Sequence, residues 1–346
     1  MHTILIALVA VMNGSDAEPV LRGATMGTTY HIKYVANPGA PNSADLQVEV
    51  TRVLAEVDRQ MSTYRPDSEL SQFNRAPAGA WFPVSTATAE VVAAAADISD
   101  KTNGALDVTV GPLVRLWHFG PQDAAASNKK SVFEPPTEAS LRAARQRVGY
   151  RHLEVQANAP ALRKQLYGIE VDLSSIASGF AIDRLAETFA ERGIDDYMIE
   201  IGGEVRASGA HADGKPWRVA IERPIVGRRE LQMAVPLVNA AIATAGSNRK
   251  FFEYAGRRYS HIIDPATGRP VEHALGSVTV VAESCIAADG WDTPLLVLGP
   301  ERGFECAERN ELAALFISNE DKSVAVRATS AWRRRFGDSQ PQRREQ

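Results

Sequence analysis

Two side chains between residues 287 and 294 are of types that could bind a hard metal ion. Asp289 and Thr293 are four residues apart in a segment predicted to be helical, so both would lie on one face of that helix. A carboxylate and a hydroxyl, with no Cys or His beside them, are oxygen ligands that suit Mg²⁺ rather than Zn²⁺. Taken alone, the segment is better explained by a structural role, with Asp289 capping the helix and Thr293 bonded to the preceding turn.

A histidine in the segment 260–270 could act as a general base. The unperturbed pKa of histidine lies near neutrality, which would allow His261 to accept a proton. Asp264 follows three residues later, and in a strand the two side chains would point to opposite faces, so they would pair only if the strand bends. A single histidine more often has a structural role, and aspartate before proline more often forms an Asx turn.

Two further aspartates lie in segments that could contact a nucleotide. Asp107 is in the apolar stretch 106–110, where a charged group must be paired, solvated or functional. Asp172 is in the segment 171–180, which is predicted to run from a strand into small residues that open a helix. Small residues let a ligand approach the backbone, and amides at the start of a helix attract phosphate. An N-capped helix without a ligand explains this segment equally well.

The elements that would position these residues indicate an α+β fold, because the predicted strands and helices are partly segregated along the chain. We predict helices at 44–61, 85–102, 137–148, 178–192, 289–298 and 300–309. The N-terminal half also contains predicted strands at 28–34 and 106–110, a surface loop at 122–136 and a hairpin within 153–173. Short strands at 197–201, 217–222, 232–237, 241–245, 251–254, 257–263 and 277–282 are typical of antiparallel sheet. No GxGxxG motif or P-loop opens a predicted helix.

Composition argues against some classes of protein. The net charge of -4 over 346 residues argues against a general nucleic-acid binder, which needs a basic face. The two cysteines, Cys285 and Cys306, are too few for a disulfide framework and do not form a zinc-binding pattern. Whether they bridge each other or stay reduced is left open by the sequence.

The first 17 residues predict a secretory signal peptide. The apolar run 4–12 is too short to span a membrane, and Ser15-Asp16-Ala17 has the small-x-small pattern of a cleavage site. A buried first strand is the alternative. No cysteine lies near this site, which excludes a lipid anchor on cysteine. We therefore expect an exported protein with one domain at 18–337 and a disordered polar tail at 338–346.

Taken together, these segments resemble the ApbE family of FAD:protein FMN transferases. The stretches that carry the resemblance follow the family's order from Met26 to about Ile317: MGTTYHIKY, MSTYRPDSELSQFN, GALDVTVGPLVRLWHFG, VDLSSIASGFAID, IGGEV, PWRVAIERP, SHIIDPATGRP and AADGWDTPLLVLG. Each motif is weak by itself, but their order over most of the chain is specific. The resemblance implies a single α+β domain with mixed, largely antiparallel sheets and packed helices.

The resemblance also implies roles for individual residues. At the FAD site it places Met26, Tyr64, Ala105, Leu106, Asp107, Asp172, Ser178 and Ile263. Tyr64 would pack on a ring face of the flavin, and Ile263 would touch FAD through its main chain. It assigns the metal to the main-chain oxygen of Ser175 and to the side chains of Asp289 and Thr293, and the base to His261.

Three features depart from the family pattern. Ser175 replaces the second glycine of the common DLGGIAKG pattern, which resembles one branch of the family. Many members carry lysine or glutamate where this chain has Ser178, so a charged contact to FAD is missing. Pro294 follows the metal threonine where a small residue is usual. We expect this proline in an early turn of its helix, where proline is tolerated.

The activity implied by the resemblance is Mg²⁺-dependent transfer of FMN from FAD to a Thr or Ser hydroxyl of an acceptor protein, with release of AMP. The acceptor would be a flavoprotein subunit of a membrane redox complex exposed outside the cytoplasm. This protein would then be periplasmic and could associate with the inner membrane. One alternative is an FAD pyrophosphatase, in which water replaces the hydroxyl. Another is a non-catalytic periplasmic flavin-binding module, against which Asp289, Thr293 and His261 argue because binding alone needs neither metal nor base.

Overall fold

A central sheet of eight strands organises the molecule, in a computed structural model that describes residues 18–37, 39–120, 133–248, 250–320 and 323–337. The strand order is β1-β2-β6-β7-β10-β15-β16-β17, and all neighbouring pairs are antiparallel. The strands are β1 (Val20–Thr25), β2 (Thr28–Tyr34), β6 (Tyr197–Ile201), β7 (Glu204–Ser208), β10 (Ala240–Gly246), β15 (Leu275–Ala282), β16 (Ala313–Glu320) and β17 (Ser323–Ala328). The strands predicted at 28–34, 197–201, 241–245 and 277–282 all belong to this sheet.

Smaller antiparallel sheets lie outside the central one. One contains β3 (Phe82–Pro83), β5 (Ala161–Lys164) and β4 (Leu153–Gln156). The others are the pairs β8 (Trp217–Glu222) with β9 (Leu231–Leu237), β11 (Phe251–Tyr254) with β12 (Arg257–Ser260), and β13 (Ile263–Asp264) with β14 (Arg269–Pro270). These pairs confirm the largely antiparallel α+β class.

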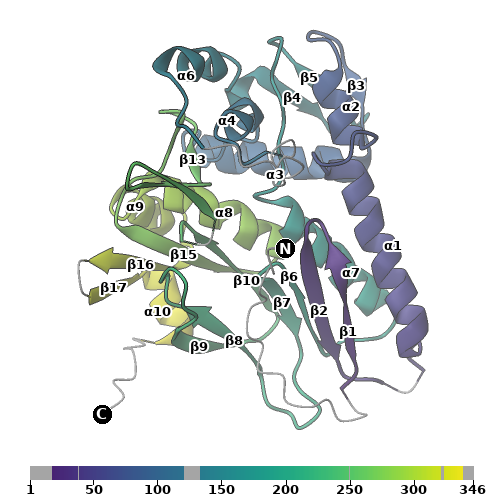
Figure 1. Cartoon of the computed structure of the whole chain (residues 1–346). Helices are drawn as coiled ribbons and strands as arrows, with labels where there is room; N and C mark the ends of the chain where they lie inside the picture. The colour runs from purple at the N-terminus through teal and green to yellow at the C-terminus, as the bar shows by residue number, and fades with distance from the viewer. Residues whose placement is uncertain (1–17, 38, 121–132, 249, 321–322, 338–346) are drawn as a thin grey trace.

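Most of the helices lie on one face of the central sheet, and the β8–β9 hairpin and the C-terminal helix α10 (Ser330–Phe336) lie on the other (Figure 1). The helices are α1 (Ser43–Met61), α2 (Glu69–Arg75), α3 (Thr86–Lys101), α4 (Gly111–Leu116), α6 (Glu138–Arg145), α7 (Ala177–Glu191), α8 (Cys285–Leu298), α9 (Arg302–Arg309) and α10 (Ser330–Phe336). Because side chains alternate along a strand, Ile199 packs under the helices and Met198 packs under β8–β9. Both faces are buried, so apolar side chains from the inner strands pack on both sides of the sheet.

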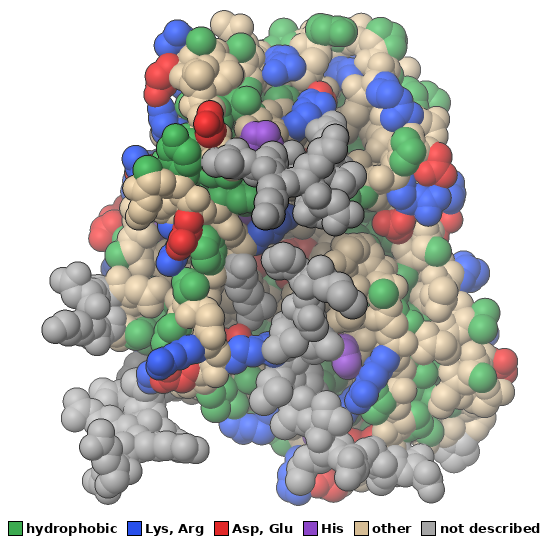
Figure 2. Space-filling model, viewed as in Figure 1, with side chains coloured by type: hydrophobic (Ala, Val, Ile, Leu, Met, Phe, Trp, Pro, Cys, Tyr) green, Lys and Arg blue, Asp and Glu red, His purple; other side chains and the backbone are tan. Residues whose placement is uncertain are grey.

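Several sequence expectations can be settled on the described residues. No helix there has the length and apolarity that a membrane span requires. Both cysteines are free and buried, Cys285 at the start of α8 and Cys306 in α9. Figure 2 shows acidic and basic side chains mixed over the visible face, as the small net charge suggests. The predicted signal peptide at 1–17, most of the loop at 122–136 and the tail at 338–346 lie outside the described residues.

One predicted strand in the N-terminal half is wrong, and one predicted hairpin there is shorter than expected. Residues 106–110 form turns that lead into α4, and Val110 makes only an isolated bridge with Glu170. The cause is Asp107, whose carboxylate accepts hydrogen bonds from Thr109 N and Oγ1 at 2.8 and 2.6 Å and so competes with strand pairing. The hairpin expected within 153–173 is confined to β4 and β5.

Glu200 on β6 gives a stability prediction. Its side chain is buried, and its Oε2 has no hydrogen-bond partner in the described part of the chain. Burial raises the pKa of Glu200 from 4.5 to about 7, although the Gly203 amide and the Arg229 charge act in the opposite direction. A raised pKa in the folded state means that stability is lost as pH rises from 4.5 to 7. The free energy of unfolding of Glu200→Gln, measured relative to that of the wild type, should therefore rise by about 3 kcal/mol between pH 4 and pH 8.

Urea unfolding at a series of pH values would measure this difference. Groups that titrate in both proteins contribute equally to both free energies of unfolding, so their contributions cancel in the difference. A difference that stays constant or shrinks with rising pH would show that Glu200 is ionised normally in the folded protein.

Candidate active site

A cavity of about 740 Å³ brings together most of the residues selected from the sequence. It lies between the end of α1, the turns at 105–107 and 172–178, the base of the β11–β12 hairpin and one turn of α8. Eleven of the twelve predicted site residues line it: Met26, Tyr64, Ala105, Leu106, Asp107, Asp172, Ser175, Ser178, His261, Ile263 and Thr293. The twelfth, Asp289, is only 5% exposed and lies one helical turn before Thr293 on α8.

Met26 and Tyr64 come from the N-terminal part of the chain, and both line the cavity. Met26 and Gly27 form the two-residue turn between β1 and β2, with φ of 47° and 74°. Positive φ at both positions is typical of a type I′ hairpin turn, in which a side chain other than Gly, Asn or Asp is uncommon. Tyr64 is 56% exposed, in the loop between α1 and α2, so a face of its ring can be reached by a ligand.

The turns that carry Asp107 and Asp172 are joined to each other. Asp172 N donates to Val108 O at 2.7 Å. Each carboxylate also holds its own turn: Asp107 accepts from Thr109 N at 2.8 Å, and Asp172 accepts from Ser174 N at 2.9 Å. Asp107 accepts a further bond from Tyr150 N at 2.9 Å, which ties its turn to a distant segment. Burial raises the pKa of Asp107, while its hydrogen bonds lower it. Both aspartates therefore shape the wall of the cavity before any ligand is considered.

His261 is held at the base of the β11–β12 hairpin. In that hairpin Phe251 pairs with Ser260, and the next pair outward is Lys250 with His261. The Lys250 carbonyl oxygen accepts from His261 N at 3.0 Å and lies 3.0 Å from His261 Nδ1. A carbonyl can only accept, so Nδ1 carries the proton and Nε2 has the free lone pair. The backbone thus selects the tautomer that a base needs.

The environment of His261 keeps the ring neutral. Burial and the neighbouring Lys250 ammonium lower the pKa of His261 to about 4, against a smaller opposite effect of its backbone hydrogen bond. At neutral pH the ring is therefore an acceptor of protons. Asp264 does not pair with it: its carboxylate accepts from Ala266 N at 2.9 Å, which confirms the expected Asx turn.

Asp289 is buried beside other carboxylates. Its Oδ2 accepts from Gly179 N at 2.8 Å. Burial raises the pKa of Asp289 well above its ordinary value, and the Glu204 carboxylate raises it further. Because α8 begins at Cys285, Asp289 is in the second turn, and the interpretation that it caps the helix is wrong. Thr293 Oγ1 donates to Asp292 Oδ1 at 3.1 Å and not to the preceding turn.

The earlier start of α8 also changes the place of Pro294. This proline is inside the helix, nine residues after Cys285, and not in an early turn as expected. Proline removes the hydrogen bond to the carbonyl four residues before it, which here belongs to Gly290.

The donor set suits Mg²⁺. Within the described ranges no three Asp, Glu, His or Cys side chains form a metal site by themselves. Magnesium needs only one or two carboxylates, because waters and substrate phosphates complete its shell. Asp289, the Thr293 hydroxyl and the Ser175 main chain are hard oxygen donors at or beneath one cavity wall. Burial is the main cause of the raised pKa of Asp289 and the Glu204 carboxylate adds to it, so a bound cation would stabilise the ionised form.

Lys250 is a site residue that the motifs missed. It lines the cavity, and its ammonium lies 5.9 Å from the centroid of the Phe119 ring. Its carbonyl fixes His261, and its charge lowers the pKa of that ring. The predicted strands at 251–254 and 257–263 could have indicated it, since a hairpin between them pairs residue 250 with residue 261.

Gly179 gives a prediction about the packing of this site. A Cβ at Gly179 would lie 2.4 Å from Cys285 O and 2.7 Å from Cys285 C, and these backbone atoms cannot move without shifting α8. Gly179→Ala should therefore destabilise the protein by about 3 kcal/mol in urea unfolding. The matched control is Gly290→Ala on α8, where the nearest atom is the mobile end of Ile98 at 2.6 Å. That variant should stay within about 1 kcal/mol of wild type, and equal losses in both would contradict the argument.

The chain matches known proteins over most of its length. A family model described as the ApbE family matches residues 26–316. The FAD:protein FMN transferase of Vibrio cholerae is 48% identical over 318 residues, 92% of this chain and 92% of that protein. The FAD:protein FMN transferase of Salmonella typhimurium is 42% identical over 308 residues, covering 88% of this chain and 86% of that protein.

Solved structures show the same relationship. The flavin transferase ApbE from Vibrio cholerae superposes with a TM-score of 0.84 at 45% identity, covering 92% of this chain and 99% of that chain. The Pseudomonas stutzeri flavinyl transferase ApbE, in its apo form, gives a TM-score of 0.83 at 39% identity, covering 93% of this chain and 98% of that chain. The resemblance inferred from the motifs is thus confirmed. With a family match over most of its length and relatives of this identity and coverage, the chain belongs to the ApbE family.

Proposed function

We propose that this protein is an FAD:protein FMN transferase that moves the FMN moiety of FAD onto a Thr or Ser hydroxyl of an acceptor protein, with Mg²⁺. The observation that carries the proposal is the shared cavity, in which a neutral histidine with its acceptor nitrogen free faces the same space as hard oxygen donors. Relatives with 40–48% identity carry the same enzyme name.

The start of α7 supports binding of the FAD phosphates. Its N-cap residue Ile176 makes no side-chain capping bond, and Ser178 and Ala177 line the cavity. Ala177 N donates to Leu173 O at 2.9 Å and Gly179 N donates to Asp289 Oδ2 at 2.8 Å, so among the described residues the amide of Ser178 is the one in this turn that would donate to a phosphate. Met26 and Tyr64 lie where the flavin ring would pack, and Asp107 and Asp172 shape the opposite turns.

The chemistry requires one proton acceptor. The acceptor hydroxyl oxygen forms a bond to the phosphorus of the FMN half of FAD, and the bond from that phosphorus to the bridging oxygen breaks. AMP leaves with the bridging oxygen, and the hydroxyl proton passes to Nε2 of His261. Lys250 and His261 line the same cavity, so the Lys250 ammonium would balance part of the charge of phosphates bound there.

Asp289, Thr293 and the Ser175 main chain would hold the metal. When bound, Mg²⁺ neutralises phosphate charge and orients the pyrophosphate for displacement. Asp289 must be ionised to serve as a ligand, and its raised pKa favours the protonated form until a cation arrives.

The predicted leader supports a location outside the cytoplasm. We propose that the protein is exported to the periplasm, where it could associate with the inner membrane, and that its acceptor is a flavoprotein subunit of a membrane redox complex. Expression of the full chain followed by N-terminal sequencing of the periplasmic fraction would test export. A mature protein that begins at Glu18 supports it, and retention of Met1 in the cytoplasm contradicts it.

The decisive experiment mixes the purified protein with FAD, Mg²⁺ and a candidate acceptor domain, and follows the acceptor by intact mass. An FMN adduct on a Thr or Ser that requires Mg²⁺ supports the transferase. Free FMN and AMP without an adduct would instead establish an FAD pyrophosphatase. Tight FAD binding without turnover would leave a flavin-binding module.

A further inference from the structure

Asp183 is an acidic residue in the interior of α7 whose carboxylate is almost fully used by α8. Its Oδ1 accepts from Cys285 N and its Oδ2 accepts from Ile286 N, both at 2.9 Å. The same carboxylate forms an ion pair with Arg206 on β7, and its side chain is only 10% exposed. A charge in such a place is stable only when it is paired and hydrogen-bonded.

These bonds make Asp183 the cap of another helix. The first amides of a helix have no partner within it and are usually satisfied by the residue just before. That residue here is Ser284, whose side chain makes no capping bond. Asp183 replaces it from 102 positions away in sequence, and its negative charge also suits the positive end of the α8 dipole.

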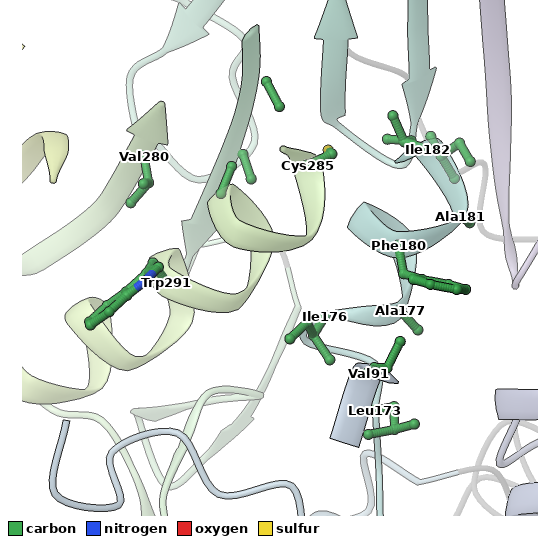
Figure 3. Packing of buried hydrophobic residues seen from close by; sticks show 14 of the residues in the cluster. Val91, Leu173, Ile176, Ala177, Phe180, Ala181, Ile182, Val280, Cys285 and Trp291 are labelled. Atoms are coloured by element: carbon green, nitrogen blue, oxygen red, sulfur yellow. The ribbon is translucent and has the colours of Figure 1, made fainter. Parts of the chain in front are cut away.

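A second contact one turn away makes the docking specific. Gly179 and Asp183 are four residues apart on α7, and Cys285 and Asp289 are four residues apart on α8, so each pair shares a helix face. Gly179 N is free to donate to Asp289 because it lies in the first turn of α7, and the bond is 2.8 Å long. Figure 3 shows the start of α8, marked by Cys285, beside the turn of α7 that carries Phe180 and Ile182.

Two such contacts determine both how far α8 slides along α7 and how it is rotated. Rotation of α8 decides whether Asp289 and Thr293, which share one face, are directed to the cavity wall. Arg206 neutralises Asp183, so the capping carboxylate can lie close to Asp289 without adding a full negative charge. Hydrophobic packing alone specifies rotation less sharply, because the apolar residues of α8 surround much of the helix.

We propose that Asp183 is a positioning residue for the metal site, which docks the start of α8 on α7 so that Asp289 and Thr293 can coordinate Mg²⁺. This inference rests on the magnesium dependence in the proposed function. Groups that orient metal ligands from behind typically change metal affinity 10–100-fold when removed.

The test measures Mn²⁺ binding by the purified protein without FAD, using the electron paramagnetic resonance signal of free Mn²⁺. Asp183→Asn keeps the size of the side chain but loses one acceptor and the ion pair with Arg206. We expect its Mn²⁺ affinity to fall at least about tenfold, with metal-free FAD binding unchanged. In the transferase assay, the Mg²⁺ concentration for half-maximal rate should rise more than the saturated rate falls.

Glu69→Gln is the matched control. Glu69 on α2 accepts from Ser85 N at 2.7 Å and Ser85 Oγ at 3.0 Å, so it also supports the start of another helix, α3, through a carboxylate. Residues of this contact do not line the active-site cavity. Glu69→Gln should lose stability without a change in Mn²⁺ affinity, which separates positioning from general destabilisation.

A double variant keeps the inference testable if Asp183→Asn does not fold. Asp183→Asn/Ser284→Asp supplies a local cap for α8 but no link to α7. It should fold and still bind Mn²⁺ weakly. If a folded Asp183→Asn or the double variant binds Mn²⁺ with the affinity of the wild type, the inference about Asp183 is wrong and the proposed function still stands. Absence of Mn²⁺ binding by the wild type, with Mg²⁺-independent transfer, would overturn both the metal site and the inference.

Discussion

Replacing His261 with alanine should lower the rate of FMN transfer by about 10²–10⁴-fold, the usual contribution of a positioned general base. The effect follows from the geometry of the ring, because the Lys250 carbonyl holds Nδ1 and leaves Nε2 to accept the hydroxyl proton. Single-turnover experiments with saturating FAD and Mg²⁺, read by intact mass of the acceptor, would isolate the chemical step. FAD affinity, measured by flavin fluorescence, should change little, since the imidazole is assigned to proton transfer.

The pH dependence provides an independent check on His261. The neutral ring is the active form, so protonation of His261 lowers the transfer rate, at saturating Mg²⁺, only when the pH falls below the pKa of about 4 that burial and Lys250 produce. Lys250→Met removes the second of these causes and should move the acid limb of kcat/KM to higher pH, toward the ordinary value of 6.5. Retention of more than a tenth of the wild-type rate in His261→Ala, or an acid limb that Lys250→Met leaves in place, would show that another group accepts the proton.

Replacing Asp289 with asparagine should reduce Mg²⁺-dependent transfer by about 10³-fold or more, since a bound metal contributes several kcal/mol to displacement at phosphorus. Asparagine can still accept the hydrogen bond from Gly179 N, so the packing of α8 on α7 should survive. The measurement is the transfer rate as a function of Mg²⁺ concentration. A variant that still responds to Mg²⁺ with wild-type affinity would move the metal site away from Asp289.

The same variant should be more stable than the metal-free wild type at high pH. The folded pKa of Asp289 is raised above 3.8, so the folded state holds its proton longer than the unfolded state does. Stability is therefore greatest below pH 3.8 and is lost as pH rises toward the folded pKa. Asparagine has no such loss. Added Mg²⁺ should stabilise the wild type increasingly as pH rises and should leave Asp289→Asn unchanged, which urea unfolding with and without Mg²⁺ would show.

Local sequence patterns correctly predicted those helices and strands that are determined by their own residues. The apolar spacing and the N-cap at Ser85 predicted α3, and Ser85 Oγ does accept from Thr88 N at 3.2 Å. Alternation and β-branched residues predicted β2 and β6, because strand propensity and burial agree there. The prediction at 106–110 was wrong because one side chain, Asp107, hydrogen-bonds its own backbone and favours a turn.

The start of α8 could not be predicted from the local sequence, because it depends on a contact with a distant residue. Periodicity predicted a helix from Asp289, yet it begins four residues earlier because its first amides are capped by Asp183 on another helix. A residue 102 positions away leaves no trace in the local sequence. The same non-local contact changed the interpretation of Asp289 from a cap to a buried carboxylate.

By itself, the sequence determined the α+β class, the family and the set of residues that meet at the cavity, since ordered motifs and local periodicity are properties of the chain. Only the tertiary structure decided the tautomer of His261, its lowered pKa, the burial of Asp289 and the presence of Lys250 beside the base. These properties depend on which groups face one another across the fold and on how much water remains between them. Burial and neighbouring charge set protonation, and both arise only when distant segments pack together.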